Sequence, residues 1–191
     1  VSLPRRESKN GKGHKGFLVN ADPRMTFEEA SARRDFTINS IGFDPIHQLW
    51  LDPNHGREDL RKGILRHVGP AFAEDPLRVL RGAQFAARLN FQLAPETLEL
   101  CQTLDLNELS RERLLSEFKK MLLRAERPSI GLEILRQTKT LRFFPELEAL
   151  IDVPQDPTWH PEGCVWTHTL MVVDEAAKLR VGEEKADLVL M

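Results

Sequence analysis

The segment EDPLRVLRGAQFAARLNF, from Glu74 to Phe91, constrains the fold more than any other part of the chain. It opens with Asp75 before Pro76, the preferred pairing of a helix N-cap and a first helical residue. The apolar residues that follow recur at helical spacing. The sequence therefore predicts a long helix that ends near Leu89.

The two sides of this helix differ in chemistry. At about 100° per residue, the side that should pack inward carries Leu80, Ala83 and Ala87. The other side carries a carboxylate at the helix start, two guanidinium groups, a glycine and an aromatic ring, namely Asp75, Arg78, Arg81, Gly82 and Phe85. Because arginine offers planar donors and aspartate offers acceptors, this side can hydrogen-bond the edge of a nucleobase. The alternative is that Asp75 only caps the helix and that the arginines are solvated.

The residues before this helix predict a mixture of short strands and short helices. The strands are expected at Val1–Pro4, Gly16–Val19, Ser40–Phe43, Gln48–Leu51 and Ile64–His67. The helices are expected at Thr26–Ala30 and Gly56–Lys62, and Thr26 with Glu29 forms a capping-box pattern.

The residues after it predict helices throughout. These are expected at Pro95–Thr103, Arg111–Arg124, Pro128–Gln137 and Trp166–Leu179. Ser110 can cap the second of them. The apolar residues of the helix expected at Arg111–Arg124 repeat at helical spacing and are predicted to lie in the core. They are Leu114, Leu115, Phe118, Met121 and Leu122. The fold class is therefore α+β.

The charge balance excludes a protein that is basic overall. The chain of 191 residues holds 27 Lys and Arg against 29 Asp and Glu, a net charge of -2. One strip near the start is locally basic, and it either faces RNA phosphates or is a solvated loop: Arg5, Arg6, Lys9, Lys12 and Lys15. Two cysteines are too few for a disulfide framework, and no stretch approaches the roughly 18 apolar residues of a membrane span. We expect a cytoplasmic protein with no membrane partner.

Two further groups of residues could carry chemistry. ARRDFTIN, Ala32–Asn39, places two arginines and an aspartate before an apolar segment, which could hold a phosphate and a ribose hydroxyl or could simply start a helix. Near the end of the chain, potential metal ligands gather at His160, Glu162, Cys164, His168 and Asp174. Their spacing is not that of a zinc finger, so capping and core roles are the alternative.

Three blocks, taken in order and at their spacings, resemble the bacterial tRNA nucleotidyltransferase and poly(A) polymerase family. They are ARRDFTINSIGFD, DPNHGREDLRKGILRHV and AFAEDPLRVLRGAQFAARLNF. The closing FFPELEALIDVPQDPTWHPEGCVWTHTL is similar to the join to an HD-type body domain. The resemblance implies that residues 1–70 are the C-terminal part of a polymerase-β-like nucleotidyltransferase head. Residues 71–157 would be a helical neck that binds nucleotide and RNA, and residues 158–191 the start of an HD-like body.

The resemblance also implies roles for single residues. Arg34 and Asp35 would contact the incoming nucleotide, with Asp35 near the ribose hydroxyl. Asp75 and Arg78 would pair with the base of CTP or ATP as an amino-acid template, and Arg81 would support the same site. The basic strip would lie near RNA or triphosphate.

Some family features differ or are missing. Gly56–Leu60 matches a flexible hinge block, but many members have an arginine where Gln84 stands. The family's Gly-Gly, Arg-Asp block and its Asp-x-Asp pair, which holds two Mg²⁺ ions, are not found here. We therefore expect the catalytic carboxylates upstream of Val1, and we expect this piece alone to be inactive. His168 is similar to the first histidine of an HD site without its partners, so no complete metal site is expected.

The expected function is nucleotidyl transfer to tRNA. The full-length protein would add C, C and A, or A alone, to the tRNA 3′ end from CTP and ATP with Mg²⁺, and it would act as a monomer. Three alternatives stay open: a poly(A) polymerase of the same family, a non-catalytic nucleotide- or RNA-binding module, and a metal phosphohydrolase centred on His168.

Overall fold

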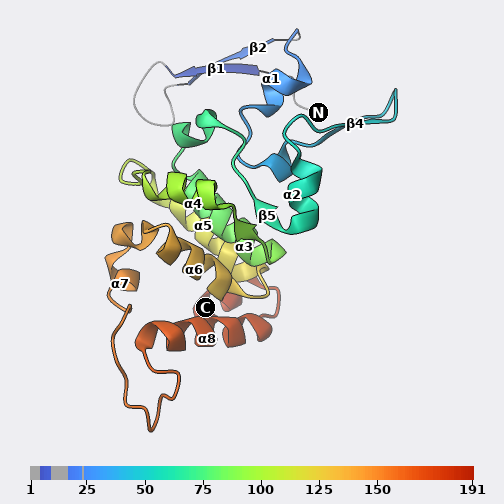
Figure 1. Cartoon of the computed structure of the whole chain (residues 1–191). Helices are drawn as coiled ribbons and strands as arrows, with labels where there is room; N and C mark the ends of the chain where they lie inside the picture. The colour runs from blue at the N-terminus through green and yellow to red at the C-terminus, as the bar shows by residue number, and fades with distance from the viewer. Residues whose placement is uncertain (1–4, 10–16, 23) are drawn as a thin grey trace. The chain divides into compact units, whose positions relative to one another are not determined.

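The computed structural model describes residues 5–9, 17–22 and 24–191. It divides the chain into two compact units, Val1–Asp75 (unit 1) and Pro76–Met191 (unit 2). Unit 1 mixes short strands and helices, whereas unit 2 is built almost entirely of helices (Figure 1). The predicted α+β class is therefore confirmed. The strand predicted at Val1–Pro4 lies outside the described residues.

Unit 1 begins with a two-stranded antiparallel sheet and a capped helix. Strand β1 (Arg5–Lys9) pairs with β2 (Phe17–Ala21), with Arg5 opposite Ala21. Helix α1 (Phe27–Ser31) has the predicted capping box, because Glu29 N–H donates to Thr26 Oγ1 at 3.2 Å and Thr26 N–H donates to Glu29 Oε2 at 2.9 Å. The local pattern alone thus fixes where this helix starts.

The rest of unit 1 closes around buried aromatic rings. Its elements are a 3-10 helix η2 (Thr37–Asn39), the hairpin of β3 (Gly42–Asp44) and β4 (Leu49–Leu51), helix α2 (Gly56–Lys62), strand β5 (Ile64–Leu65) and a 3-10 helix η3 (Pro70–Glu74). Phe36 and Phe72 are fully buried, and their ring centroids lie 5.5 Å apart, edge to face. Backbone bonds from Thr37 N–H to the Arg66 carbonyl and from Val68 N–H to the Asp35 carbonyl flank this core at 2.9 and 3.2 Å.

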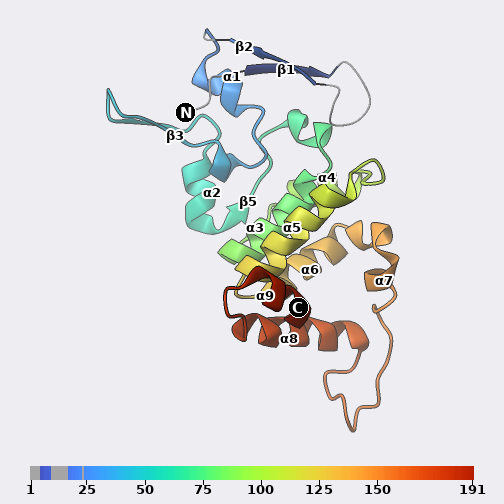
Figure 2. The same cartoon turned by 180° about the vertical axis from the view of Figure 1, so that it is seen from behind.

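Unit 2 is a stack of helices. In chain order it contains α3 (Arg78–Leu89), β6 (Gln92–Leu93), α4 (Pro95–Gln102), α5 (Arg111–Arg124), α6 (Pro128–Gln137), η4 (Thr140–Phe143), α7 (Pro145–Glu148), α8 (Val165–Lys178) and α9 (Glu184–Leu190). Helix α3 packs against α5 and α6, and α8 packs against α6 (Figure 2). The predicted bounds of α5 and α6 are confirmed. None of the helices in the described ranges is long and apolar enough to cross a membrane.

Helices α3, α5 and α6 lie close together at Gly131. A β-carbon added there would lie 2.2 Å from Met121 Sδ on α5 and 2.9 Å from the Ala83 carbonyl oxygen on α3. Met121 and Ala83 are themselves buried. Glycine at this position is what allows the three helices to approach so closely.

Two predictions about which helix faces are buried are wrong. Leu115, expected in the core, is 55% exposed, whereas Glu117 on the same helix is 4% exposed. Leu115 and Glu117 are two residues apart, so they point about 200° away from each other around the helix. Gly82, expected on the ligand-facing side of α3, is buried.

Candidate functional site

The RRD block, residues 33–35 of the ARRDFTIN segment, lies between α1 and η2 in unit 1. Asp35 is 7% exposed, and its Oδ1 accepts hydrogen bonds from Phe36 N–H at 2.8 Å and from Asn39 Nδ2 at 3.0 Å. Arg34, by contrast, is exposed. Two hydrogen bonds therefore hold the Asp35 carboxylate in place, and the guanidinium group of the neighbouring Arg34 is accessible to solvent.

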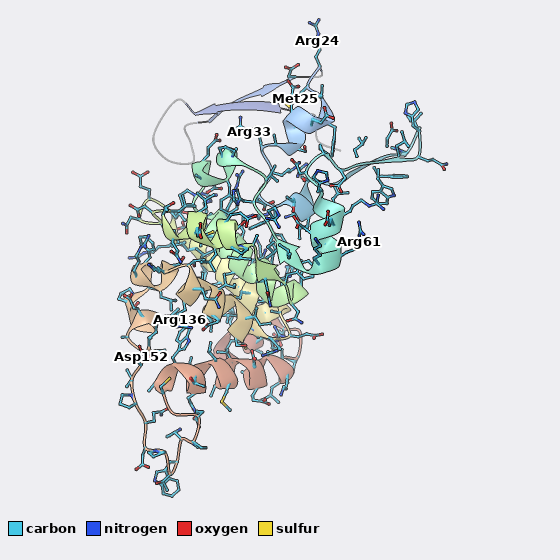
Figure 3. The ribbon with its side chains drawn as sticks, in the orientation of Figure 1. Arg24, Met25, Arg33, Arg61, Arg136 and Asp152 are labelled. Carbon is cyan, nitrogen blue, oxygen red and sulfur yellow. The ribbon has the colours of Figure 1, made fainter. Side chains whose placement is uncertain are left out.

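An ion pair joins this block to the residues before Asp75. Arg33, labelled in Figure 3, donates from Nη2 to Glu74 Oε2 at 2.9 Å, and both residues belong to unit 1. The two side chains are about one-third and one-half exposed, so the pair is worth about 0–1 kcal/mol. Arg33, one of the two arginines expected to hold a phosphate, is thus paired with Glu74, a residue for which the sequence predicted no role.

The N-cap position predicted at Asp75 is wrong. Helix α3 begins at Arg78, its N-cap is Leu77, and the Leu77 side chain makes no capping bond. Asp75 instead follows directly on η3, and a turn at Pro76 separates it from the helix, with Val79 N–H donating to the Pro76 carbonyl at 3.1 Å.

Arg78 and Arg81 lie one turn apart at the start of α3, and both are partly exposed. The Arg81 guanidinium lies 5.5 Å from the centroid of the Phe85 ring and 4.0 Å from Glu117 Oε1 on α5. Contacts within unit 2 thus hold Arg81 from two directions.

Glu117 is the buried acid behind this site, and the sequence analysis missed it. Its Oε1 accepts from Lys120 Nζ at 2.7 Å, and its Oε2 is buried without a hydrogen-bond partner among the described residues. Burying a carboxylate is costly unless cations compensate it, and Lys120 and Arg81 supply them. A charge at position 117, inside the apolar stripe of α5 between Leu114 and Met121, was the signal that could have revealed it.

Gln84 stands where many family members have an arginine. It is 1% exposed, and its Oε1 accepts a hydrogen bond from Arg88 Nη1 at 3.1 Å. In this chain position 84 is therefore an internal polar contact along α3.

The block that was expected to be a flexible hinge, Gly56–Leu60, forms the first part of α2. Asp52 accepts from the N–H groups of Gly56 at 2.7 Å and Arg57 at 3.0 Å. Asp59, 6% exposed, accepts from Thr37 Oγ1 at 2.8 Å and from Arg66 Nε at 3.1 Å. These bonds fix the block within unit 1, and a hinge motion there stays a prediction.

The basic strip can be placed only in part. Arg5, Arg6 and Lys9 belong to β1, and Lys12 and Lys15 lie outside the described residues. Its contact with RNA therefore stays a prediction.

Three of the potential metal ligands converge at the start of α8. Glu162 Oε1 lies 3.1 Å from His160 Nδ1 and 2.5 Å from His168 Nδ1. The backbone N–H of Glu162 and then the His168 imidazole lower the pKa of the Glu162 carboxyl to about 2. Cys164 and Asp174 bond elsewhere, to Thr167 and to Ser129.

Two family models match the chain. The one described as the poly A polymerase head domain matches residues 4–66, and the one described as the probable RNA and SrmB-binding site of polymerase A matches residues 90–151. The first lies within unit 1 and the second within unit 2.

Curated relatives are similar over nearly the whole chain. The multifunctional CCA protein of Xylella fastidiosa (strain 9a5c) is 47% identical over 190 residues, which are 95% of this chain and 45% of that protein. The multifunctional CCA protein of Stenotrophomonas maltophilia (strain K279a) is 47% identical over 96% of this chain and 47% of its own length. The chain thus spans about half the length of these relatives.

Solved structures are similar as well. The CCA-adding enzyme of Bacillus stearothermophilus in complex with CTP is 37% identical, with a TM-score of 0.53, over 58% of this chain and 29% of that chain. A tRNA-processing enzyme with CTP is 29% identical, with a TM-score of 0.58, over 86% of this chain and 52% of that chain.

Proposed function

Since the chain belongs to the family of CCA-adding enzymes and poly(A) polymerases, we propose that it works in an enzyme that adds C, C and A, or A alone, to the 3′ end of tRNA. The substrates would be CTP and ATP, with pyrophosphate released. Support comes from relatives named multifunctional CCA proteins and from similar structures that contain CTP. The head model on residues 4–66 and the RNA-binding model on residues 90–151 support a division into head (1–70), neck (71–157) and the start of a body (158–191).

The observation that carries this proposal is the start of α3. Two arginines stand one turn apart on it, and Glu117 lies beside Arg81. Arg78 would donate to acceptors on the base edge, and Asp75 would accept from a base amino group. A base whose edge leaves such a donor or acceptor unpaired would lose about 1–3 kcal/mol, which would favour C and A over G and U.

Two residues of unit 1, Asp35 and Arg34, would contact the ribose and the phosphates of the nucleotide. Asp35, held by Phe36 N–H and Asn39, is placed to accept from a ribose hydroxyl. Arg34, which is exposed, would pair with phosphate oxygens.

The reaction would need a divalent metal ion, which we propose to be Mg²⁺. Its usual ligands in this chemistry are paired carboxylates. The present chain contains no Asp-x-Asp pair, so its own residues do not fit that metal pair. The roles proposed for this chain are therefore nucleotide selection and RNA binding.

The test is Arg78→Ala in the full-length protein, supplied with tRNA that lacks its 3′ CCA. We expect the preference for CTP and ATP over GTP and UTP to fall by about 10- to 100-fold, the equivalent of one lost base contact, with tRNA affinity nearly unchanged. Arg88→Ala, on the same helix but bonded to Gln84, is the matched control and should keep the preference. An unchanged preference in Arg78→Ala would contradict the template role.

A poly(A) polymerase is the second candidate, because the head model that matches carries that description. Sequencing the products made on a tRNA transcript separates the two. Addition that stops at CCA supports the first function, and a long A tail supports the second. Nucleotide binding without incorporation would support a non-catalytic module.

A further inference from the structure

The β3–β4 hairpin of unit 1 places two aromatic rings side by side on one of its faces. Phe43 stands opposite Trp50 in the register, and residues paired across two strands point to the same face. The centroids of the two rings lie 5.0 Å apart, and their planes are tilted by 51°. Phe43 is 50% exposed and Trp50 is 57% exposed. The hairpin therefore presents an aromatic surface to solvent.

Contacts at both ends of this hairpin fix the position of the rings within unit 1. A β-carbon added at Gly42 would lie 2.5 Å from Cε2 of Phe27 on α1, so the first strand runs close against that helix. At the turn, Asp44 Oδ1 accepts hydrogen bonds from the N–H groups of Ile46 at 2.9 Å and His47 at 3.2 Å. The turn itself lies away from α2 (Figure 1). A surface that is formed in advance loses little conformational entropy when a partner binds.

Two arginines of α2 accompany the aromatic pair. The Arg57 guanidinium lies 5.2 Å from the centroid of the Trp50 ring, which is within the range of a cation–π contact. Arg61, labelled in Figure 3, is one turn further along, and its Nε donates to the Arg57 carbonyl at 3.1 Å. Within the part of the chain that the structure describes, neither arginine forms an ion pair with a carboxylate.

The acidic side chains between β3 and the end of α2 are all engaged by other groups. They are Asp44, Asp52, Glu58 and Asp59. Glu58 pairs with Lys62 at 2.6 Å, and Asp59 pairs with Arg66 at 3.1 Å. The guanidinium groups of Arg57 and Arg61 therefore remain available to a negatively charged partner.

Exposed aromatic rings beside available arginines have the chemistry that binds unpaired nucleic acid. Bases stack on aromatic rings, and guanidinium groups attract the phosphates between them. An apolar protein partner would bury both arginines without an opposite charge, which is costly. The observations therefore favour RNA over a protein as the partner of this surface.

We propose that the hairpin surface, formed by Phe43, Trp50, Arg57 and Arg61, binds unpaired bases of the RNA substrate. It lies in unit 1, whereas the family model with an RNA-binding description matches residues 90–151. None of the four residues belongs to the nucleotide site proposed above. The inference rests on the proposed function only in taking tRNA that lacks its 3′ CCA as that RNA.

The test is binding of the full-length protein to fluorescein-labelled tRNA that lacks its 3′ CCA, measured by fluorescence anisotropy. Trp50→Ala should weaken binding by about 5- to 100-fold, the effect of losing one stacked base. Trp50→Phe keeps an aromatic ring and should bind within about threefold of the original protein. Because neither CTP nor ATP is present, the result is separate from nucleotide addition, on which the proposed function depends.

Leu49→Ala is the matched control for the loss of exposed apolar surface. Leu49 is 58% exposed and stands opposite Asp44, so it points to the other face of the hairpin. This variant should bind the labelled tRNA as tightly as the original protein does. Circular dichroism would show that each variant is folded.

The dependence of binding on salt separates stacking from charge. Arg57→Ala and Arg61→Ala should each reduce the slope of log affinity against log salt by about 0.7, the value for one phosphate of a single strand. Trp50→Ala should leave this slope unchanged although it lowers the affinity. Lys62→Ala removes the same charge from the same helix, but Lys62 pairs with Glu58, so the slope should stay the same.

Three results would overturn the inference. The first is normal tRNA binding by Trp50→Ala, and the second is an equal loss of affinity in Leu49→Ala. The third is an original protein that forms a dimer in analytical ultracentrifugation while Trp50→Ala is a monomer, which would assign the surface to a second copy of the chain.

Discussion

At the scale of single residues, the surroundings of Gly56 leave no room for a side chain. It is the first residue of α2, and an added β-carbon would lie 2.0 Å from the Thr37 carbonyl oxygen and 2.9 Å from Ile41 Cγ1. A backbone oxygen cannot rotate away as a side chain can. Any larger residue must therefore push α2 and η2 apart. This would strain the hydrogen bonds that Asp52 accepts from Gly56 and that Asp59 accepts from Thr37.

Gly56→Ala should lower the free energy of unfolding by about 3 kcal/mol, the upper part of the range for overpacking. Urea denaturation followed by circular dichroism measures it. Gly69→Ala is the matched control, because Gly69 has extended backbone and nothing lies within 4 Å of its added β-carbon. That variant should differ from the original by less than about 1 kcal/mol. Equal stability of the two variants would contradict the close contact at Gly56.

Cys101 should make stability depend on alkaline pH. It is 2% exposed, and burial raises the pKa of its thiol from 9.0 to about 12. The folded state favours the neutral thiol, so this contribution is complete below pH 9 and is lost as the pH rises towards 12. The chain contains no tyrosine that would titrate in the same range.

The measurement is the free energy of unfolding of the original chain and of Cys101→Ala at pH 8 and pH 10. The variant should be less stable at pH 8 because it leaves a cavity. Its stability should also fall less between the two pH values. Parallel changes in both proteins would show that the thiol does not titrate on unfolding.

At the scale of helices, α8 supplies the cap that α6 lacks. The N-cap residue of α6, Arg127, makes no side-chain capping bond. Asp174 of α8 instead accepts from Ser129 N–H at 3.0 Å and from Ser129 Oγ at 2.7 Å. A carboxylate at this end of a helix also interacts favourably with the helix dipole. The two helices are therefore joined by a polar contact as well as by packing.

Asp174→Ala should lower the free energy of unfolding by about 1.5–3 kcal/mol, the usual range for hydrogen bonds to a charged group. Glu175→Ala is the matched control on the same helix, since Glu175 pairs with exposed Lys178 one turn away. It should cost less than about 0.5 kcal/mol. Thermal unfolding measures the stability of both variants. Equal losses of stability would contradict the assignment of Asp174 as the cap of α6.

Local signals in the sequence predicted most elements, and contacts between distant residues account for what was missed. The capping box at Thr26 and the cap at Ser110 lie within four residues of the groups that they bind, and both are confirmed. The Asp174 cap crosses 45 residues of chain, so no local pattern could reveal it. Buried Glu117 depends in the same way on Arg81 of another helix. The N-cap position was predicted at Asp75 and lies at Leu77, because a turn at Pro76 moves the helix start to Arg78.

At the scale of the whole chain, each of the two units has buried apolar residues of its own. Phe36, Leu65 and Phe72 form the buried centre of unit 1, and unit 2 is centred on residues such as Leu80 and Leu135. Chains that are divided into more than one compact unit commonly depart from two-state unfolding.

We expect calorimetry of the full chain to show two unfolding transitions. Gly56→Ala should lower the midpoint of one transition, and Asp174→Ala should lower that of the other, because these residues belong to different units. A single transition whose calorimetric and van't Hoff enthalpies agree, shifted by both variants, would show that the chain unfolds as one cooperative body.

The crowded position at Gly131 has an evolutionary consequence. Its neighbour Met121 leaves no space for a methyl group there, and the Ala83 carbonyl oxygen cannot retreat without moving α3. Substitutions at positions 131 and 121 should therefore be correlated among homologues. Homologues with alanine or serine in place of this glycine are expected to carry a shorter side chain where methionine stands here, so that the summed volume of the pair stays nearly constant.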